Sequence, residues 1–297
     1  MTLQHCLNTF NVVTIKEQRI KTKKGLGPRR FKMEKNNFKT VNLGKGVVEV
    51  YDFGAVKLHA YKTNDLITDE CFLLEKGGKM FMVEAPCFFD NIKELEAYIQ
   101  GLSVEFVGTV IAYHGAGATF MKGAPVYSTR HADDYNHNGG GAALIKNFTA
   151  AFGDAFDSSI YATTDFIEGE TLNLAGIDMR IVATQEAFDI EFPEINVVYT
   201  HMMGHDVHSI VAGSKHADAI IAQLTDYLDR GISLILTSHY TVENLEDARA
   251  KIQYLKMMKN IAFKSVNPAA FKSAMKQEFA NYSGENYLDM TAGMFYK

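Results

Sequence analysis

Residues 69–86 read Asp69-Glu-Cys-Phe-Leu-Leu-Glu-Lys-Gly-Gly-Lys-Met-Phe-Met-Val-Glu-Ala-Pro86. Apolar residues dominate both sides of Lys76-Gly77-Gly78, and glycines between two such runs predict a β-hairpin. Upstream, apolar and polar residues alternate over 47–52 and 56–61, which is typical of strands with one buried face. The first part of the chain is therefore predicted to form a sheet of antiparallel strands.

The rest of the chain alternates between strand and helix patterns. A helix is predicted over 90–101, where Ile92, Leu95 and Ile99 share one face and Gly101 ends the pattern. Short apolar runs, typical of strands covered on both faces, occupy 106–113, 195–200 and 232–238, and helices are predicted over 215–230 and 242–259. This order predicts an α/β layered domain. The polar stretch 131–141 and the acidic stretch 189–194 are expected to be exposed loops or turns.

Composition narrows the class of protein. The chain has 297 residues, 47% of them hydrophobic, which is enough for a large core. A net charge of −5 argues against a nucleic-acid-binding surface, and the absence of an 18-residue apolar run argues against a spanning helix. Three cysteines, Cys6, Cys71 and Cys87, are too few for a disulfide framework. We therefore expect a cytoplasmic protein with reduced thiols.

Basic residues are concentrated at the N-terminus, where residues 1–35 hold nine Lys or Arg and two Glu. Residues 1–39 are therefore expected to be a flexible basic arm, and residues 40–297 a single domain. Two alternatives stay open: Met33 is the start of a shorter form, or the arm is an electrostatic tether.

Three histidines follow apolar strands directly: His114, His201 and His239. Binding sites in α/β sheets form outside the ends of strands, so these side chains are predicted to share one cleft. The alternative is that each is a hydrogen-bonded loop histidine.

The segment 200–209 is the richest in chemistry, with His201, His205, Asp206 and His208 close together. On a helix the three histidines would share one face, with a spacing that suits Zn²⁺ or Fe. Gly204 and the preceding strand argue against a helix, and a polar network that organises a loop is the alternative.

The order of these elements resembles the metallo-β-lactamase fold over most of residues 45–260. The hairpin 69–86 resembles that family's opening strands, which normally end in Asp-Thr-Gly, whereas this chain has Glu84-Ala85-Pro86. The resemblance implies an α/β protein with a four-layer αββα sandwich.

The family's metal signature, His-x-His-x-Asp-His, is replaced. Its four ligand positions match Tyr113, Gly115, Gly117 and Ala118, and His114 falls between the first two. His201 stands where the family has a bridging Asp, and His239 matches the family's last histidine. Glycine and alanine side chains cannot bind metal, so the resemblance implies a degenerate, histidine-rich metal site.

Two functions follow from these patterns. The first is a hydrolase that uses metal-activated water on a small ester, amide, lactone or phosphoester. His114, His201, His205 and His239 would bind one Zn or Fe ion, and Asp206 or His208 would be the base. The alternative is a non-catalytic small-molecule-binding or assembly protein without metal.

A third hypothesis is a metal-independent enzyme that uses its histidines as acid and base. In each case the expected partner is a small molecule rather than nucleic acid or a membrane, and a homodimer is compatible with the sequence.

Overall fold

A computed structural model describes residues 33–202 and 204–296. Packing begins before the boundary expected at residue 40, because Met33 is buried in the core and Lys35 pairs with Asp247 at 2.6 Å. Residues 1–32 of the expected arm, including Cys6, lie outside the described residues.

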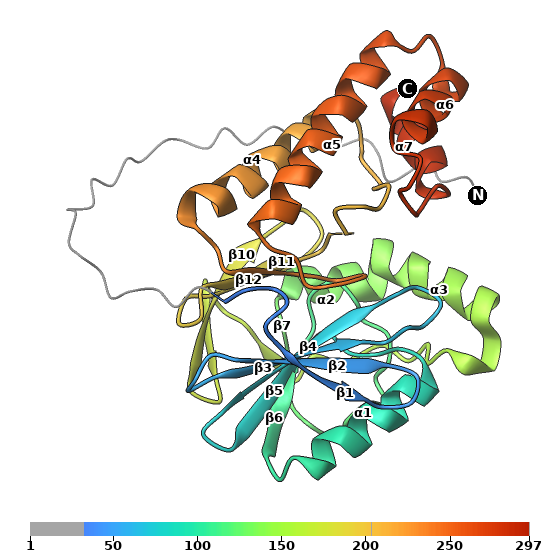
Figure 1. The fold of residues 1–297 in the computed structure, drawn as a ribbon. Coiled ribbons are helices and arrows are strands. Elements are labelled where there is room, and N and C mark those ends of the chain that lie inside the picture. The colour runs from blue at the N-terminus through green and yellow to red at the C-terminus, as the bar shows by residue number, and fades with distance from the viewer. Residues whose placement is uncertain (1–32, 203, 297) are drawn as a thin grey trace. The chain divides into compact units, whose positions relative to one another are not determined.

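The first sheet has eight strands in chain order (Figure 1). They are β1 (Lys39–Asn42), β2 (Val47–Asp52), β3 (Lys57–Lys62), β4 (Glu70–Lys76), β5 (Lys79–Val83), β6 (Glu105–Val110), β7 (Val126–Ser128) and β8 (Asp165–Phe166). Strands β1 to β5 pair antiparallel, and β5 to β8 pair parallel. The predicted hairpin of β4 and β5 is confirmed.

The second sheet has five strands in the order β13-β12-β11-β10-β9. They are β9 (Thr171–Leu174), β10 (Ile177–Ala183), β11 (Phe188–Phe192), β12 (Val197–Thr200) and β13 (Leu234–Thr237). Strands β12 and β13 pair parallel, with Thr200 opposite Thr237. Their carboxyl ends, and the histidines that follow them, therefore lie at the same edge.

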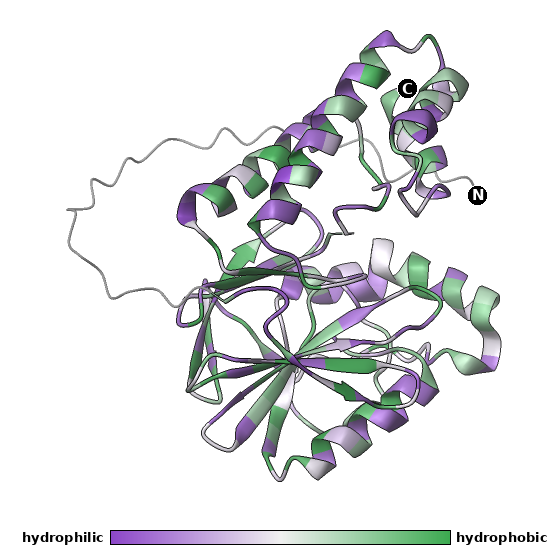
Figure 2. Cartoon of the chain, viewed as in Figure 1, coloured by the Kyte–Doolittle hydropathy of each residue, from purple (hydrophilic) through white to green (hydrophobic). Residues whose placement is uncertain are grey.

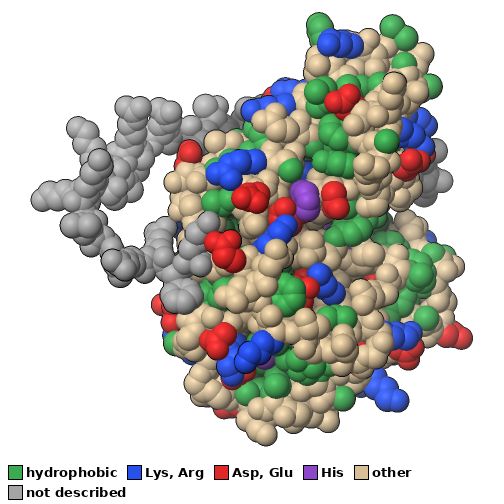
Figure 3. Space-filling view, viewed as in Figure 1, with side chains coloured by type: hydrophobic (Ala, Val, Ile, Leu, Met, Phe, Trp, Pro, Cys, Tyr) green, Lys and Arg blue, Asp and Glu red, His purple; other side chains and the backbone are tan. Residues whose placement is uncertain are grey.

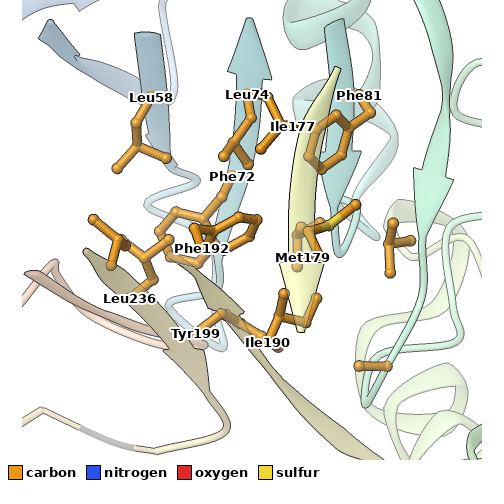
Figure 4. Close-up of a cluster of buried hydrophobic side chains, with 14 of the residues drawn as sticks. Leu58, Phe72, Leu74, Phe81, Ile177, Met179, Ile190, Phe192, Tyr199 and Leu236 are labelled. Atoms are coloured by element: carbon orange, nitrogen blue, oxygen red, sulfur yellow. The ribbon is translucent and has the colours of Figure 1, made fainter. Parts of the chain in front are cut away.

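The main core lies between the two sheets (Figure 4). Leu58, Phe72 and Phe81 project from the first sheet and meet Ile190 and Phe192 from the second. All five are fully buried. Each large apolar side chain that leaves water contributes about 1.5–3 kcal/mol, so this layer is the main force that joins the sheets.

Helices cover the outer faces of both sheets. Helix α1 (Phe89–Gly101) packs Ile92, Leu95 and Ile99 on the first sheet, and helices α4 (Ser214–Arg230) and α5 (Leu245–Lys264) pack on the second. Figure 2 shows hydrophobic and hydrophilic residues alternating around these helices. The predicted four-layer αββα sandwich is confirmed.

The remaining helical segments are α2 (Arg130–Asn138), α3 (Gly140–Phe152), the 3-10 turn η2 (Gly153–Ala155), α6 (Pro268–Glu278) and α7 (Tyr287–Phe295).

Two stretches expected to be loops are regular elements. Residues 131–138 belong to α2 and residues 140–141 begin α3, with Gly139 between the two helices. The Thr129 side chain caps α2 by accepting the Ala132 N–H at 3.1 Å. Residues 188–192 form β11, and Asp189 in it is buried.

The described surface is mixed in character. Acidic and basic side chains are interspersed on the face shown in Figure 3. Within residues 33–202 and 204–296, none of the helices combines the length and apolar character needed to cross a bilayer.

Candidate metal centre

Three of the predicted histidines meet at one place. His114 lies beyond the end of β6, His201 directly after β12, and His239 two residues after β13. The Nε2 atoms of His114 and His201 are 3.2 Å apart, and the His239 ring centroid lies 5.0 and 5.6 Å from the other two. One nitrogen of each ring lies within 4.8 Å of the others. The expected gathering of these residues is therefore present.

The spacing of the rings fits a bound metal ion. Two nitrogens that bind tetrahedral Zn²⁺ at about 2.0–2.1 Å lie about 3.3–3.4 Å apart, close to the 3.2 Å between His114 and His201. His201 is exposed at the surface, but its ring stacks on Tyr113 and lies beside two other histidines, and this partial desolvation together with the neighbouring positive charges lowers its pKa below 6.5. Neutral imidazole is the ligand form, and three histidines leave a fourth position open, as in catalytic zinc sites.

Asp69 supports the group from outside. Its Oδ1 lies 3.1 Å from Nδ1 of His239 and 3.9 Å from Nδ1 of His114. The His239 Nδ1–H also faces the Ile67 carbonyl at 3.2 Å, so Nε2 is left to bind a ligand. Burial favours the neutral form of Asp69, but the charges of His114 and His239 outweigh this effect and lower the pKa of Asp69. Asp69 in turn raises the pKa of His239, although burial of His239 acts in the opposite direction.

Glu84 fixes the backbone that carries His114. It follows β5 with a φ of 55° and is fully buried. Its carboxylate accepts the N–H of Tyr113 at 2.7 Å and of His114 at 3.1 Å, and the hydroxyl of Tyr199 at 2.8 Å. Burial raises the pKa of Glu84, and these hydrogen bonds oppose the rise. The turn that presents His114 is thus tied to both sheets.

Tyr113 is a platform for His201. The two rings stack with centroids 4.6 Å apart and planes at 16°. The Tyr113 hydroxyl donates to Asp189 Oδ1 at 2.8 Å, and Gln223 donates to Asp189 Oδ2 at 2.7 Å. Burial raises the pKa of Asp189 to about 6. The residue at the first ligand position of the resembled signature therefore orients a ligand candidate instead.

Removing the Tyr113 hydroxyl should have a modest, specific effect. Tyr113→Phe leaves the buried Asp189 with one donor fewer, which should lower the free energy of unfolding by about 1–3 kcal/mol. The pKa of Asp189 should also rise, because the carboxyl loses a donor that favours its charged form. Urea unfolding and NMR titration check this, with Tyr127→Phe on β7 as the control. Equal effects of the two variants would contradict the prediction.

Two of the other signature positions have no room for a side chain. A Cβ on Gly117, whose φ is +92°, would lie 2.3 Å from the Pro86 carbonyl oxygen. A Cβ on Gly115 would lie 2.7 Å from Cβ of Asn136. The short approach to the Pro86 backbone at Gly117 and to the Asn136 side chain at Gly115 explains why these two positions are glycine. Ala118 packs against the core beneath α1.

The expectation that His205 and His208 join this centre is wrong. Residues 201, 202 and 204–208 are not helical, so the three histidines do not share the face of one helix. His205 instead places Nδ1 3.0 Å from Glu243 and Nε2 3.5 Å from Asp247. His208 is fully buried, with Nδ1 3.1 Å from the Tyr254 hydroxyl, and so cannot serve as a solvent-facing base.

Lys251 explains the shape of this loop. Its buried ammonium donates to the carbonyls of Gly204 and Val207 at 2.9 and 3.0 Å, which removes them from helical pairing. Asp206 lies between these two residues and is exposed. It does not belong to the group of ligand atoms formed by His114, His201 and His239.

His205 should make stability depend on pH. Its hydrogen bond to Glu243 raises its pKa above 6.5. The folded state then binds this proton more tightly than the unfolded chain, so the stabilisation is complete below pH 6.5 and is lost as pH rises through the raised value. Urea unfolding of wild type and His205→Gln should differ most at about pH 6 and least at about pH 9. A difference that grows with pH would contradict this.

Asp69, Glu84 and Asp189 surround the centre but are not among the residues predicted from the sequence. Glu84 follows β5 as directly as the histidines follow their strands, so the same position rule could have found it, whereas Asp69 precedes β4 and is not covered by that rule. Asp189 lies inside a strand and gave no such signal.

Comparison with known proteins supports the fold. No sequence-family model and no curated protein matches the chain. Among solved structures, the stereoselective inverting sec-alkylsulfatase Pisa1 from Pseudomonas sp. is 14% identical with a TM-score of 0.57, covering 80% of this chain and 49% of that one. This chain therefore spans about half the alkylsulfatase length.

Two metallo-β-lactamases are also similar. The protein from Erythrobacter litoralis is 11% identical with a TM-score of 0.49, covering 74% of this chain and 100% of that one. The protein from Pontibacter korlensis is 15% identical with a TM-score of 0.46, covering 70% and 99%. The chain has the metallo-β-lactamase fold and lacks the His-x-His-x-Asp-His signature.

Proposed function

We propose that the chain is a metal-dependent hydrolase in which His114, His201 and His239 bind one Zn or Fe ion. The observation that carries this proposal is the 3.2 Å approach of two ring nitrogens beside a third histidine that Asp69 contacts from behind. The three side chains follow different strands of the two sheets, so their convergence is a property of the whole fold and not of one loop.

The chemistry divides between ion and protein. A bound ion of this kind supplies Lewis acidity and makes water a nucleophile near neutral pH. Asp69 orients His239, Glu84 fixes the backbone at His114, and Tyr113 holds the ring of His201. These contacts preorganise the ligands, so little reorganisation is needed when the ion binds.

The substrate class follows from the chemistry of such a centre. Small carboxylic esters, amides, lactones and phosphoesters are attacked by activated water. The similarity to an alkylsulfatase adds sulfate esters as a class to test. Fold similarity does not choose among them, because activity depends on the site.

The test uses full-length protein purified without an affinity tag. We expect at least one bound Zn or Fe per chain, turnover of one ester class, loss of turnover on chelation, and recovery on adding the metal back. Turnover that continues after complete metal removal would favour the metal-independent alternative. In that case the 3.2 Å contact between His114 and His201 would be an N–H···N hydrogen bond. Protein with neither metal nor turnover would favour the non-catalytic alternative.

A further inference from the structure

We propose that Asp65, Asp69 and Cys87 form a second site, for a divalent ion that accepts both oxygen and sulfur ligands, such as Zn²⁺. One ligand atom of each lies within 4.8 Å of the others. This site goes beyond the proposed function, whose ion is bound by histidines alone.

The distance between thiol and carboxylate suits such an ion. Sγ of Cys87 lies 3.5 Å from Oδ2 of Asp69. In a tetrahedral site with Zn–S of about 2.3 Å and Zn–O of about 2.0–2.2 Å, sulfur and oxygen lie about 3.6 Å apart. Both residues are nearly fully buried, Asp69 at 3% and Cys87 at 5% exposure, so packing already sets this spacing.

Asp65 supplies an oxygen without a partner. Its Oδ1 accepts the Ile67 N–H at 2.9 Å and the Asp69 N–H at 3.4 Å, so the carboxylate is fixed in place. Its Oδ2 is buried and has no hydrogen-bond donor among the described residues. A buried polar atom without a partner is costly, and coordination of a cation would remove that cost.

The charges of the cluster are incompletely balanced. Oδ1 of Asp69 is buried without a hydrogen bond among the described residues and relies on ion pairing with His239 and His114, while the His239 Nδ1–H is shared with Ile67. The carboxylates of Asp65 and Asp69 lie close together, and Asp69 is buried, so negative charge is concentrated at this place. A divalent ion would offset the two carboxylate charges, and with the Cys87 thiolate as the third ligand the site would carry one net negative charge.

Asp69 would belong to both centres. Oδ1 faces His239, and Oδ2 faces Cys87. A thiolate ligand favours Zn²⁺ or Co²⁺ over Mg²⁺ or Ca²⁺. Binding would release the thiol proton of Cys87 to solvent, because the thiolate is the ligand form.

The test is Co²⁺ titration of the full chain carrying Cys6→Ser and Cys71→Ala, in which Cys87 is the remaining thiol. We expect a near-ultraviolet thiolate-to-cobalt charge-transfer band. Adding Cys87→Ser should abolish the band and reduce bound Co²⁺ by one equivalent. Adding Asp65→Asn should weaken Co²⁺ binding at the band, with circular dichroism confirming the fold of each variant. Saturation with Co²⁺ without the band, or unchanged stoichiometry in Cys87→Ser, would overturn the proposal.

A histidine variant separates the two centres. His201→Ala in the same background should lose the histidine-bound ion and keep the band, because His201 is not in the second site. Loss of the band with His201→Ala would overturn the second site as an independent centre. If the band is present and His201→Ala leaves the amount of bound metal unchanged, the second site is supported and the histidine centre is refuted.

Discussion

Replacing His239 with alanine should lower metal affinity at the histidine centre by more than about 100-fold, because loss of an outer partner alone typically costs 10–100-fold. Only two of the three nitrogens within 4.8 Å would remain. Turnover should fall to the background rate, since the chemistry depends on the ion. Competition with a chromophoric chelator measures affinity, and the ester panel measures turnover.

His137→Ala is the matched control for this variant. His137 lies in α2 and is exposed, with Nδ1 2.9 Å from the Asp133 carbonyl oxygen. Its removal should change neither affinity nor turnover. Equal losses in both variants would indicate a general effect on folding and would refute the assignment of His239.

Gly117→Ala should lower the free energy of unfolding by about 3–5 kcal/mol, the combined cost of backbone strain and forced packing. The new Cβ would meet the Pro86 carbonyl oxygen at 2.3 Å, in a backbone conformation with φ +92°. The atoms that this Cβ would meet belong to the backbone of Pro86 and Cys87, so the clash can be removed only if the backbone moves. Urea denaturation measures the effect.

Gly123→Ala separates strain from clash. Gly123 has a φ of +93°, nearly the same as Gly117, but a Cβ at this position would meet nothing within 4 Å. It should therefore cost only the strain, about 1–3 kcal/mol. If both variants lost the same stability, close approach to Pro86 would not be the reason for Gly117.

The sequence predicted elements whose pattern is local. The hairpin of β4 and β5, helix α1 and the strands before the three histidines each carry their own periodicity. Strand β11 was missed because Asp189 made the segment look solvated, whereas Tyr113 and Gln223, distant in the chain, satisfy its carboxylate. Helix α2 was not predicted because its sequence is mostly polar and shows little apolar periodicity, although Thr129 is a helix-capping residue.

The candidate centre was predictable only in part. His114, His201 and His239 were found because each follows a strand, and position at a strand end is visible in sequence. His205 and His208 were wrongly included because closeness in sequence suggested a shared helix face. Lys251, more than 40 residues away, determines that loop instead.

The three histidines come from both halves of the sandwich: His114 follows a strand of the first sheet, and His201 and His239 follow strands of the second. An ion bound by all three would link the two sheets. It would bind the folded chain, in which the sheets are packed together, and not a chain in which they are apart. At a free concentration 100 times its dissociation constant, such a ligand adds about 2.7 kcal/mol to stability. The melting temperature would then report metal supply, and metal capture would be a late event in folding.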